Sequence, residues 1–291
     1  MNWTIEYSDD PEAFEARVRD YLLEDEALHN VALGVLRTLQ QNPNYYSGDN
    51  MLACVHDDGE IGGVVTRTPP FPGLLSRAVD EDAVSAMVDA LVEKYPDLDG
   101  IIGPAESVEI AVRRLEDLGF ESNIGQRQRL YRTTTVEPPT GVPGEMRTAR
   151  AGDRELLEDW LARFAVEAEG QDEEEAREGA ESMAGLFIEQ EAARIWVADD
   201  EPVCVAAIAG RSPNGLRIGY VYTPPKFREN GYASALTAAL TQEALDAGCE
   251  HCFLYADLDN ATTNRIYPAI GYEPVADQHL YELTPPSEER G

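Results

Sequence analysis

One stretch of the sequence brings two basic residues and a glycine to the junction between a predicted strand and a predicted helix. It runs from Val221 to Ala233 and reads V-Y-T-P-P-K-F-R-E-N-G-Y-A. Gly231 allows a positive φ or a close approach of a ligand to the backbone, and the small Ala233 leaves the helix start uncovered. The free N–H groups and the dipole of a helix N-terminus bind anions, and Lys226 and Arg228 add positive charge. We therefore expect a phosphate-bearing ligand here.

The spacing in this stretch differs from two common phosphate-binding loops. A mononucleotide loop reads G-x-x-x-x-G-K-[ST] and a dinucleotide loop reads G-x-G-x-x-G, and residues 221–233 contain neither pattern. Their spacing is Arg228-x-x-Gly231-x-Ala233. It resembles the R/Q-x-x-G-x-G/A pyrophosphate loop of the GNAT superfamily of N-acetyltransferases.

Segments on both sides of the loop extend this resemblance in the same order. Residues 221–225 resemble the V-Y-T-P-P strand end of one GNAT branch. Residues 254–267 look like its L-Y-x-D-x-x-N-P-x-S-N-x-I-Y segment, and residues 270–275 like its G-[FY]-x-P-V close. The resemblance implies a two-domain member of the superfamily, with a degenerate GNAT-like N-terminal half.

The resemblance also implies which residues hold the co-substrate, acetyl-CoA. The loop would bind the pyrophosphate mainly through backbone N–H groups, and the preceding strand would splay from its neighbour and pair with the pantetheine arm as an added strand does. Two asparagines would contact that arm or shape the next helix. The implied cofactor-binding residues are Val221, Tyr222, Thr223, Arg228, Glu229, Asn230, Gly231, Tyr232, Ala233, Asn260 and Asn264.

Tyr267 matches the family's tyrosine that faces the thioester sulfur. Attack by an amine releases a thiolate, and a phenol with an ordinary pKa of about 10 can protonate it. Backbone N–H groups at the splayed strand would stabilise the oxyanion. Simpler roles stay open: Tyr267 as a packed core residue, Arg228 as a surface arginine, and Asn260 or Thr223-Pro224-Pro225 as strand stops.

Two positions depart from the family pattern. Glu229-Asn230 stands where the branch usually has a glycine and a basic or polar residue. A carboxylate beside a pyrophosphate is repulsive unless it points outward. Ala261 replaces a common proline, which should loosen that turn slightly. The loop is thus expected to bind CoA atypically.

Periodicity and turn residues predict a mixed α/β fold, and the resemblance implies a mostly antiparallel sheet flanked by helices, in two tandem GNAT-like domains. Domain 1 would cover residues 1–136, and the Pro- and Gly-rich residues 137–144 would form a linker. Domain 2 would cover residues 145–291, with Asp153 as a helix N-cap. Its predicted strands are 145–149, 194–198, 203–210, 216–222, 251–257 and 279–283, and its predicted helices are 153–166, 172–191, 232–247 and 262–270.

The first half gives a weaker pattern, with a hairpin at 51–66, helices at 81–94 and 107–118 and a strand at 100–103. Two short echoes favour a duplication: Thr68-Pro69-Pro70 with Thr223-Pro224-Pro225, and residues 118–121 with 270–273. Because no pyrophosphate-loop pattern follows Pro70, we expect this half not to bind CoA. It would wall the acceptor cleft or support the active half.

The net charge of −32, with only Lys94 and Lys226 as lysines, is the unusual feature of the composition. Such a field repels nucleic acid and anionic membranes, so neither is expected as a partner. It resembles the surface of a halophile's protein, or alternatively that of a GC-rich mesophile with an acidic proteome. No apolar run is long enough to span a membrane and no leader is evident, so a cytoplasmic protein is expected.

Cysteine spacing does not predict a metal site. Cys54 and Cys204 lie in apolar runs and are expected to be buried thiols, and Cys249-x-x-Cys252 has no second ligand pair nearby. The expected function is transfer of acetyl from acetyl-CoA to a primary amine of a small molecule or peptide. The alternatives are a non-catalytic acyl-CoA sensor and an enzyme using another acyl-CoA. No general base is evident, since Glu167 and Glu169 have the pattern of solvated residues; whether the protein is a monomer or homodimer stays open.

Overall fold

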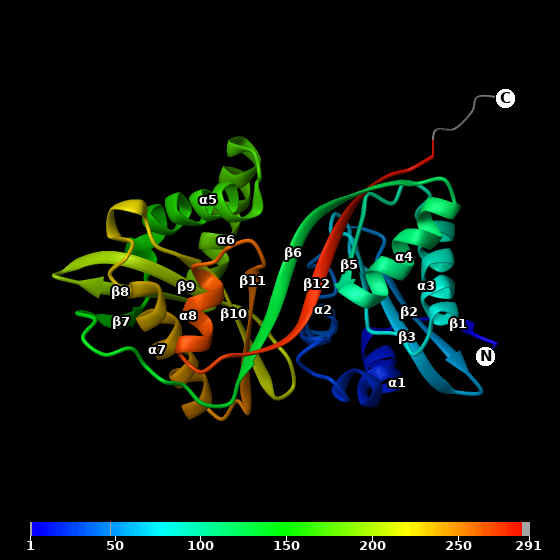
Figure 1. The fold of residues 1–291 in the computed structure, drawn as a ribbon, viewed down its shortest axis with the longest axis horizontal. Helices are drawn as coiled ribbons and strands as arrows, with labels where there is room; N and C mark the ends of the chain where they lie inside the picture. Colours follow the sequence, from blue (N-terminus) through cyan, green and yellow to red (C-terminus); the bar gives the residue numbers. More distant parts are fainter. Residues whose placement is uncertain (1, 47, 287–291) are drawn as a thin grey trace. The chain divides into compact units, whose positions relative to one another are not determined.

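The computed structural model describes residues 2–46 and 48–286, and they divide into two compact units. Unit 1 comprises residues up to Leu130 together with those from Val275 onward, and unit 2 comprises Tyr131–Pro274. The chain therefore enters unit 2 near the end of one strand and returns to unit 1 near the start of another (Figure 1).

Unit 1 is a mixed sheet covered on both faces. Its strands have the order β1-β2-β3-β4-β5-β12-β6, with β4 and β5 parallel. Along β2, Met51, Ala53 and Val55 pack with α3 and α4, whereas Leu52 and Cys54 pack with α1 and α2. Burial on both faces explains the unbroken apolar run of this strand. The elements are β1 (Thr4–Tyr7), α1 (Pro11–Leu23), α2 (Asn30–Gln41), β2 (Met51–Asp57), β3 (Glu60–Arg67), β4 (Gly73–Leu75), α3 (Glu81–Lys94), β5 (Gly100–Pro104), α4 (Ala105–Asp117), β6 (Glu121–Thr133) and β12 (Glu273–Thr284).

Unit 2 repeats this layered arrangement around the strand order β11-β10-β9-β8-β7. The β10–β11 pair is parallel and the other pairs are antiparallel, as predicted for the fold class. Cys204 and Ala206 of β9 pack with α7 and α8, and Val205 and Ala207 pack with α5 and α6. The elements are β7 (Glu145–Thr148), η1 (Ala151–Asp153), α5 (Arg154–Glu169), α6 (Glu173–Glu189), β8 (Ala193–Ala198), β9 (Glu201–Arg211), β10 (Gly215–Tyr222), η2 (Pro225–Phe227), α7 (Tyr232–Asp246), β11 (His251–Asp257) and α8 (Thr263–Ala269).

The two halves of the chain contain the same order of elements. From β1 to β6 and from β7 to β12 the order is β-α-α-β-β-β-α-β-α-β, apart from short 3-10 turns. One echo holds: Gly119 and Gly271 both follow the last helix of their half, with φ of 91° and 100°. The other echo is wrong. Thr68-Pro69-Pro70 lies between β3 and β4, whereas Thr223-Pro224-Pro225 follows β10, the counterpart of β4.

The observed units differ from the predicted domains in the place of the last strand, β12. A strand was predicted at 279–283 within a second domain of residues 145–291. The observed β12 is longer and pairs antiparallel with β5, with Leu280 opposite Ile102. Leu283 joins the core of unit 1. An apolar pattern predicts a strand but not its partner.

Two local expectations also change. The side chain of Asp153 makes no cap bond to α5. Its carboxylate instead accepts both outer nitrogens of Arg147 at 2.7 Å and the N–H of Arg150 at 2.8 Å. The predicted linker, residues 137–144, contains no helix or strand, but its Val142 packs on the core of unit 2, as does Val136 just before it, and Trp196 donates to the Pro143 carbonyl at 2.9 Å. It is a packed connection rather than a free tether.

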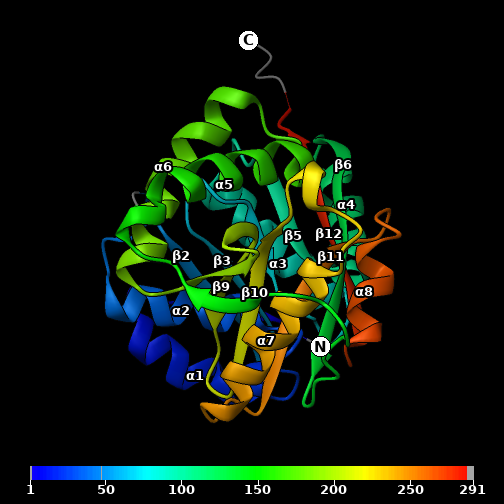
Figure 2. The same cartoon turned by 90° about the vertical axis from the view of Figure 1, so that its left-hand side faces the viewer.

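In unit 2, α5 and α7 lie against the two faces of β10. Figure 2 shows α7 running beside β9 and β10, which both contact it.

Cys54 and Cys204 are buried thiols as predicted. Burial raises the pKa of Cys204 to about 12, even though it accepts a hydrogen bond from Thr223. Among residues 2–46 and 48–286, no helix is long and apolar enough to cross a bilayer.

Candidate active and cofactor site

β10 and β11 separate after a short paired stretch. Their parallel register covers Gly215 to Arg217 of β10, opposite His251 to Phe253 of β11. β10 continues to Tyr222 and β11 to Asp257, and these described residues make no further pair with each other. The edge of β10 that faces β11 is therefore open near Val221. An open strand edge accepts an extended ligand by backbone hydrogen bonds.

A bulge lies in β10 just before this open edge. The register between β10 and β9 shifts between Gly219 and Tyr222. Tyr220 has a φ of 54°, which is uncommon for a residue other than glycine. Its ring packs against Phe164 at 5.7 Å and Phe187 at 5.2 Å between ring centroids. A bulge re-aims a peptide out of the ladder, and strained backbone of this kind is concentrated at functional sites.

The loop after β10 leaves the start of α7 uncovered. Gly231 is the N-cap residue with a φ of 79°, no side chain caps the helix, and the first turn contains no acidic residue. The Asn230 side chain donates to the carbonyls of Phe227 and Arg228 at 3.1 and 3.0 Å, which fixes the turn. A β-carbon on Gly231 would lie 3.0 Å from Val142. The first N–H groups of this 15-residue helix therefore have no side-chain cap, which is the arrangement that suits an anion.

The two cations of the loop pair with carboxylates of the chain. Arg228 donates from Nε to the Thr223 carbonyl at 2.9 Å and from Nη2 to Glu167. Lys226 donates to Glu201 at 2.8 Å. The sequence predicted the charges of both residues at the anion site but not these partners.

Tyr267 is buried on α8, with 6% of its surface exposed. Its ring lies 6.1 Å from that of Tyr131 and 6.2 Å from that of Tyr272, between centroids. Burial, with smaller contributions from Cys204 and Tyr131, raises its pKa well above the ordinary tyrosine range. Among the described residues its hydroxyl has no hydrogen-bond partner, in contrast to Tyr131, whose hydroxyl donates to Asn264 at 2.8 Å. Tyr267 thus combines the packed position of the simpler interpretation with a neutral phenol.

A family model matches the part of the sequence that forms this site. Residues 154–272 match the acetyltransferase (GNAT) family. These residues form a GNAT acetyltransferase domain. The match contains the separated strands, the open start of α7 and Tyr267.

Solved structures extend the likeness of fold over the whole chain. A GCN5-related N-acetyltransferase from Sphaerobacter thermophilus has a TM-score of 0.60 at 18% identity, covering 98% of this chain and 97% of that chain. A Drosophila protein has a TM-score of 0.65 at 14% identity, covering 97% and 99%. A tandem GNAT protein of the clavulanic acid biosynthesis pathway has a TM-score of 0.56 at 11% identity, covering 99% and 100%. The chain therefore has the fold of two tandem GNAT-like domains. No curated protein sequence matches it significantly.

The two predicted asparagines of the GNAT domain both shape the segment around α8. Asn264 donates from Nδ2 to the carbonyls of Asp257 at 2.7 Å and Asn260 at 2.9 Å, and it accepts from Tyr131. Asn260 accepts the N–H groups of Thr262 at 3.1 Å and Thr263 at 3.2 Å. Of the two roles predicted for them, these contacts support the shaping of the helix that carries Tyr267.

Glu167 is the site residue that sequence reasoning undervalued. It lies in the last turn of α5, and its Oε1 accepts from the hydroxyl of Tyr222 at 2.9 Å while Oε2 accepts from Arg228. Burial raises its pKa, but the hydrogen bonds from Arg228 and Tyr222 outweigh this and leave the pKa lowered, so Glu167 is ionised at neutral pH. A carboxylate at a helix C-terminus is disfavoured by the helix dipole. This is the one feature of the sequence that indicates that Glu167 needs a positively charged partner. Glu169 is exposed and accepts from Gln171.

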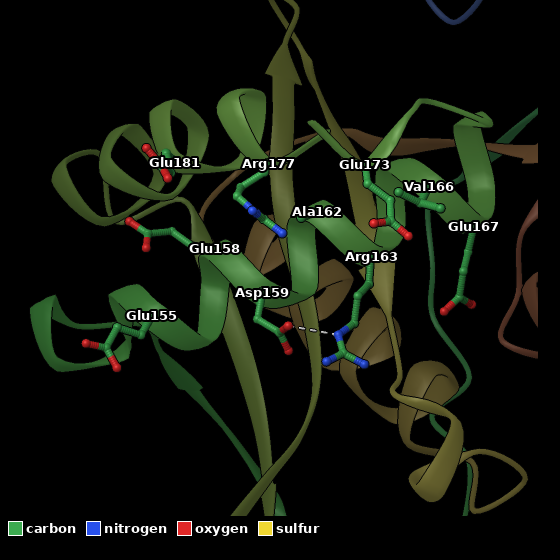
Figure 3. A pocket seen from close by; sticks show the side chains of 10 residues that line it. All are labelled: Glu155, Glu158, Asp159, Ala162, Arg163, Val166, Glu167, Glu173, Arg177 and Glu181. Atoms are coloured by element: carbon green, nitrogen blue, oxygen red, sulfur yellow. Dashed lines mark hydrogen bonds and ion pairs between the residues drawn. The ribbon is translucent and has the colours of Figure 1, made fainter. Parts of the chain in front are cut away.

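An acidic groove of about 540 Å³ lies along α5 and α6 (Figure 3). Arg163 and Asp159 point toward each other within it, 2.9 Å apart. Because carboxylates cover a chain of net charge −32, an acidic lining alone does not separate a ligand site from ordinary surface. The groove is lined by Glu155, Glu158, Asp159, Ala162, Arg163, Val166, Glu167, Glu173, Arg177 and Glu181.

The corresponding positions of unit 1 are closed. β4 has three residues, and a β-carbon on Gly103 of β5 would lie 2.6 Å from the Leu75 carbonyl oxygen, so the two backbones are in close contact. At the start of α3, Asp80 accepts the Ala83 N–H at 2.8 Å and the Trp3 indole N–H at 2.9 Å, and Glu81 follows. Acidic residues at a capped helix start disfavour a phosphate. These contacts support the hypothesis that unit 1 does not bind CoA.

Proposed function

We propose that unit 2 transfers the acetyl group of acetyl-CoA to a primary amine of a small molecule or peptide. The observation that carries this is the open edge of β10 leading directly to the uncapped start of α7. The edge at Val221 to Thr223 suits a pantetheine arm, whose amides pair as a strand does. The N–H groups following Gly231 suit the pyrophosphate.

The residues beside this edge support acyl transfer. When the amine attacks the thioester carbon, a C–N bond forms, the C–S bond breaks and negative charge develops first on the acyl oxygen. The re-aimed peptide of the β10 bulge would supply an N–H to that oxygen. The proton of Tyr267 would pass to the departing thiolate, the proton lost by the amine would pass to water, and water would return a proton to the Tyr267 phenolate. Burial of a phenol whose hydroxyl has no hydrogen-bond partner among residues 2–46 and 48–286 favours this role over a sensor without chemistry.

A thermal-shift titration of the full chain tests the proposal. CoA, acetyl-CoA and longer acyl-CoAs are added to about 100 times the Kd, where binding to the folded state alone adds about 2.7 kcal/mol of stability. We expect CoA and acetyl-CoA to raise Tm, and acetyl-CoA with an amine acceptor to release free thiol. A larger shift with a longer acyl-CoA would point to a different donor. No shift with any of them would contradict the proposal.

Glu229 is expected to weaken CoA binding through its charge, because its carboxylate would lie near the proposed pyrophosphate site. Its φ of 67° lies in the region that favours glycine, but that backbone strain is a cost to the folded chain whether or not CoA is bound, so it affects stability rather than binding. Glu229→Gln and Glu229→Gly both remove the charge and should each tighten CoA binding about two- to fivefold. Calorimetric titration at two salt concentrations measures both.

The charge part of this prediction has its own check. The advantage of Glu229→Gln should shrink between about 0.1 and 1 M salt, because the Debye length falls from about 10 to 3 Å. Weaker binding by both variants would show that Glu229 points away from the phosphates and supports the loop.

A further inference from the structure

The end of α5 and the cofactor loop of unit 2 meet at one carboxylate. Both oxygens of Glu167 are engaged: one accepts the Tyr222 hydroxyl from the end of β10, and the other accepts Arg228 from the loop. Tyr222 itself is only 4% exposed and its ring lies 6.4 Å from that of Trp160, also on α5. The position of Glu167 is thus fixed from two sides.

Arg228 is turned back toward β10 by these contacts. Its Nε donates to the Thr223 carbonyl, its Nη2 donates to Glu167, and its guanidinium carbon lies 5.8 Å from the centre of the Tyr222 ring. Two of the nitrogens that carry its five N–H donors are therefore occupied inside the chain. The backbone between Thr223 and Arg228 is closed into a ring by the Nε contact, and Glu167 holds the far side of the guanidinium.

The ion pair between Arg228 and Glu167 is too exposed to contribute much to the global stability of the protein. Its side chains are 46% and 43% exposed, and pairs of this kind contribute about 0.2–1 kcal/mol. Glu167 also lies at the C-terminal end of α5, where the helix dipole disfavours a carboxylate. What the contacts do determine is the place of Arg228, the first residue of the anion-binding turn.

We propose that Glu167 is a positioning residue for the cofactor loop: it holds Arg228 against the end of β10, so that the N–H groups of residues 229–233 stay arranged for a phosphate. This rests on the proposed function of the same site. It also makes the loop responsive to α5, since moving the last turn of this helix moves the carboxylate that fixes Arg228.

The sign of one measurement separates this role from simple electrostatics. CoA is a polyanion, so neutralising any nearby carboxylate should tighten its binding. Loss of positioning should weaken it. Glu201 provides the matched control, because it pairs with Lys226, the other cation of the loop, at 2.8 Å and with comparable exposure of 66% and 55% for the lysine and glutamate.

The binding experiment uses the full chain and CoA. Glu167→Gln is expected to raise the Kd for CoA about three- to tenfold, and Glu201→Gln to leave it unchanged or lower it. The double variant Glu167→Gln/Arg228→Ala should bind no more weakly than Arg228→Ala alone, because both changes remove the same contact. At saturating acetyl-CoA, kcat should stay within about twofold while KM for acetyl-CoA rises with Kd.

Amide hydrogen exchange of the free protein tests the proposal without CoA. Exchange in residues 228–233 should be faster in Glu167→Gln than in the wild type and unchanged in Glu201→Gln. If the wild type does not bind CoA, the proposed function fails, and the exchange result still decides the role of Glu167. Unchanged exchange, or CoA binding that tightens in Glu167→Gln, would overturn the proposal. A fall in kcat of about 100-fold at saturation with unchanged Kd would instead make Glu167 a proton acceptor.

Discussion

Tyr267→Phe is expected to lower kcat by about 10²–10⁴-fold, the usual contribution of a general acid, while the Kd for CoA stays within about twofold. The variant removes only the hydroxyl, which has no hydrogen-bond partner in the described part of the chain, and it keeps the ring contacts with Tyr131 and Tyr272. Stability should therefore change little, since no buried partner is left unpaired. Steady-state kinetics with saturating acetyl-CoA, beside a CoA titration, measures the effect.

Tyr272 supplies the matched control for this substitution. It is a buried tyrosine of the same aromatic cluster, and its hydroxyl lies 2.7 Å from that of Thr241. Tyr272→Phe should cost about 1 kcal/mol of stability, the typical net value of a hydrogen bond, and leave kcat nearly unchanged. The two variants thus have opposite expected patterns. Equal kcat in Tyr267→Phe and the wild type would remove Tyr267 from the chemistry.

The pH dependence of the wild type follows from the raised pKa of Tyr267. Burial disfavours the phenolate, so the pKa lies above the ordinary value of 10 and the acid form persists throughout the neutral and moderately alkaline range. A phenol that is protonated at rest is ready to donate to a thiolate. The kcat profile should therefore show no descending limb from Tyr267 near pH 10, where an unperturbed tyrosine would begin to lose its proton.

The fold of the GNAT domain follows from short-range patterns in the sequence. Alternation along β9 places Cys204 and Ala206 on one face and Val205 and Ala207 on the other, and both faces are covered. The glycine at 231 marks a turn with positive φ, and the structure has one there. Each of these patterns depends on neighbours within a few residues, which is why the sequence is sufficient to predict them.

The parts that could not be predicted depend on distant partners. The apolar pattern of β12 is compatible with either unit, and only its pairing with β5 decides the matter. Glu167 and Arg228 are 61 residues apart, and nothing local indicates that an exposed glutamate on α5 holds the loop. In the first half, the three-residue β4 is too short to be predicted from the sequence. Without it, Thr68-Pro69-Pro70 has the same apparent position as Thr223-Pro224-Pro225, and the sequence wrongly indicates that the two segments are equivalent.

Asn264→Ala is expected to have the largest effect on stability in unit 2, about 2 kcal/mol, because it leaves several polar groups without their partner at once. The amide of Asn264 joins the Tyr131 hydroxyl to the carbonyls of Asp257 and Asn260. Tyr131 is 3% exposed, so water does not readily replace its lost acceptor. Chemical denaturation followed by fluorescence measures the loss.

The same change should reach the chemistry through α8. Asn264 lies one turn before Tyr267 on the same helix. Tyr131, whose hydroxyl donates to Asn264, has its ring 6.1 Å from that of Tyr267, between centroids. Loosening this contact should lower kcat about tenfold, because small displacements of a reacting group are costly. Asn260→Ala removes only the cap at Thr262 and Thr263, and should cost about 1 kcal/mol with a smaller kcat effect. If Asn264→Ala were no more damaging than Asn260→Ala, the amide network would not be what holds Tyr267 in place.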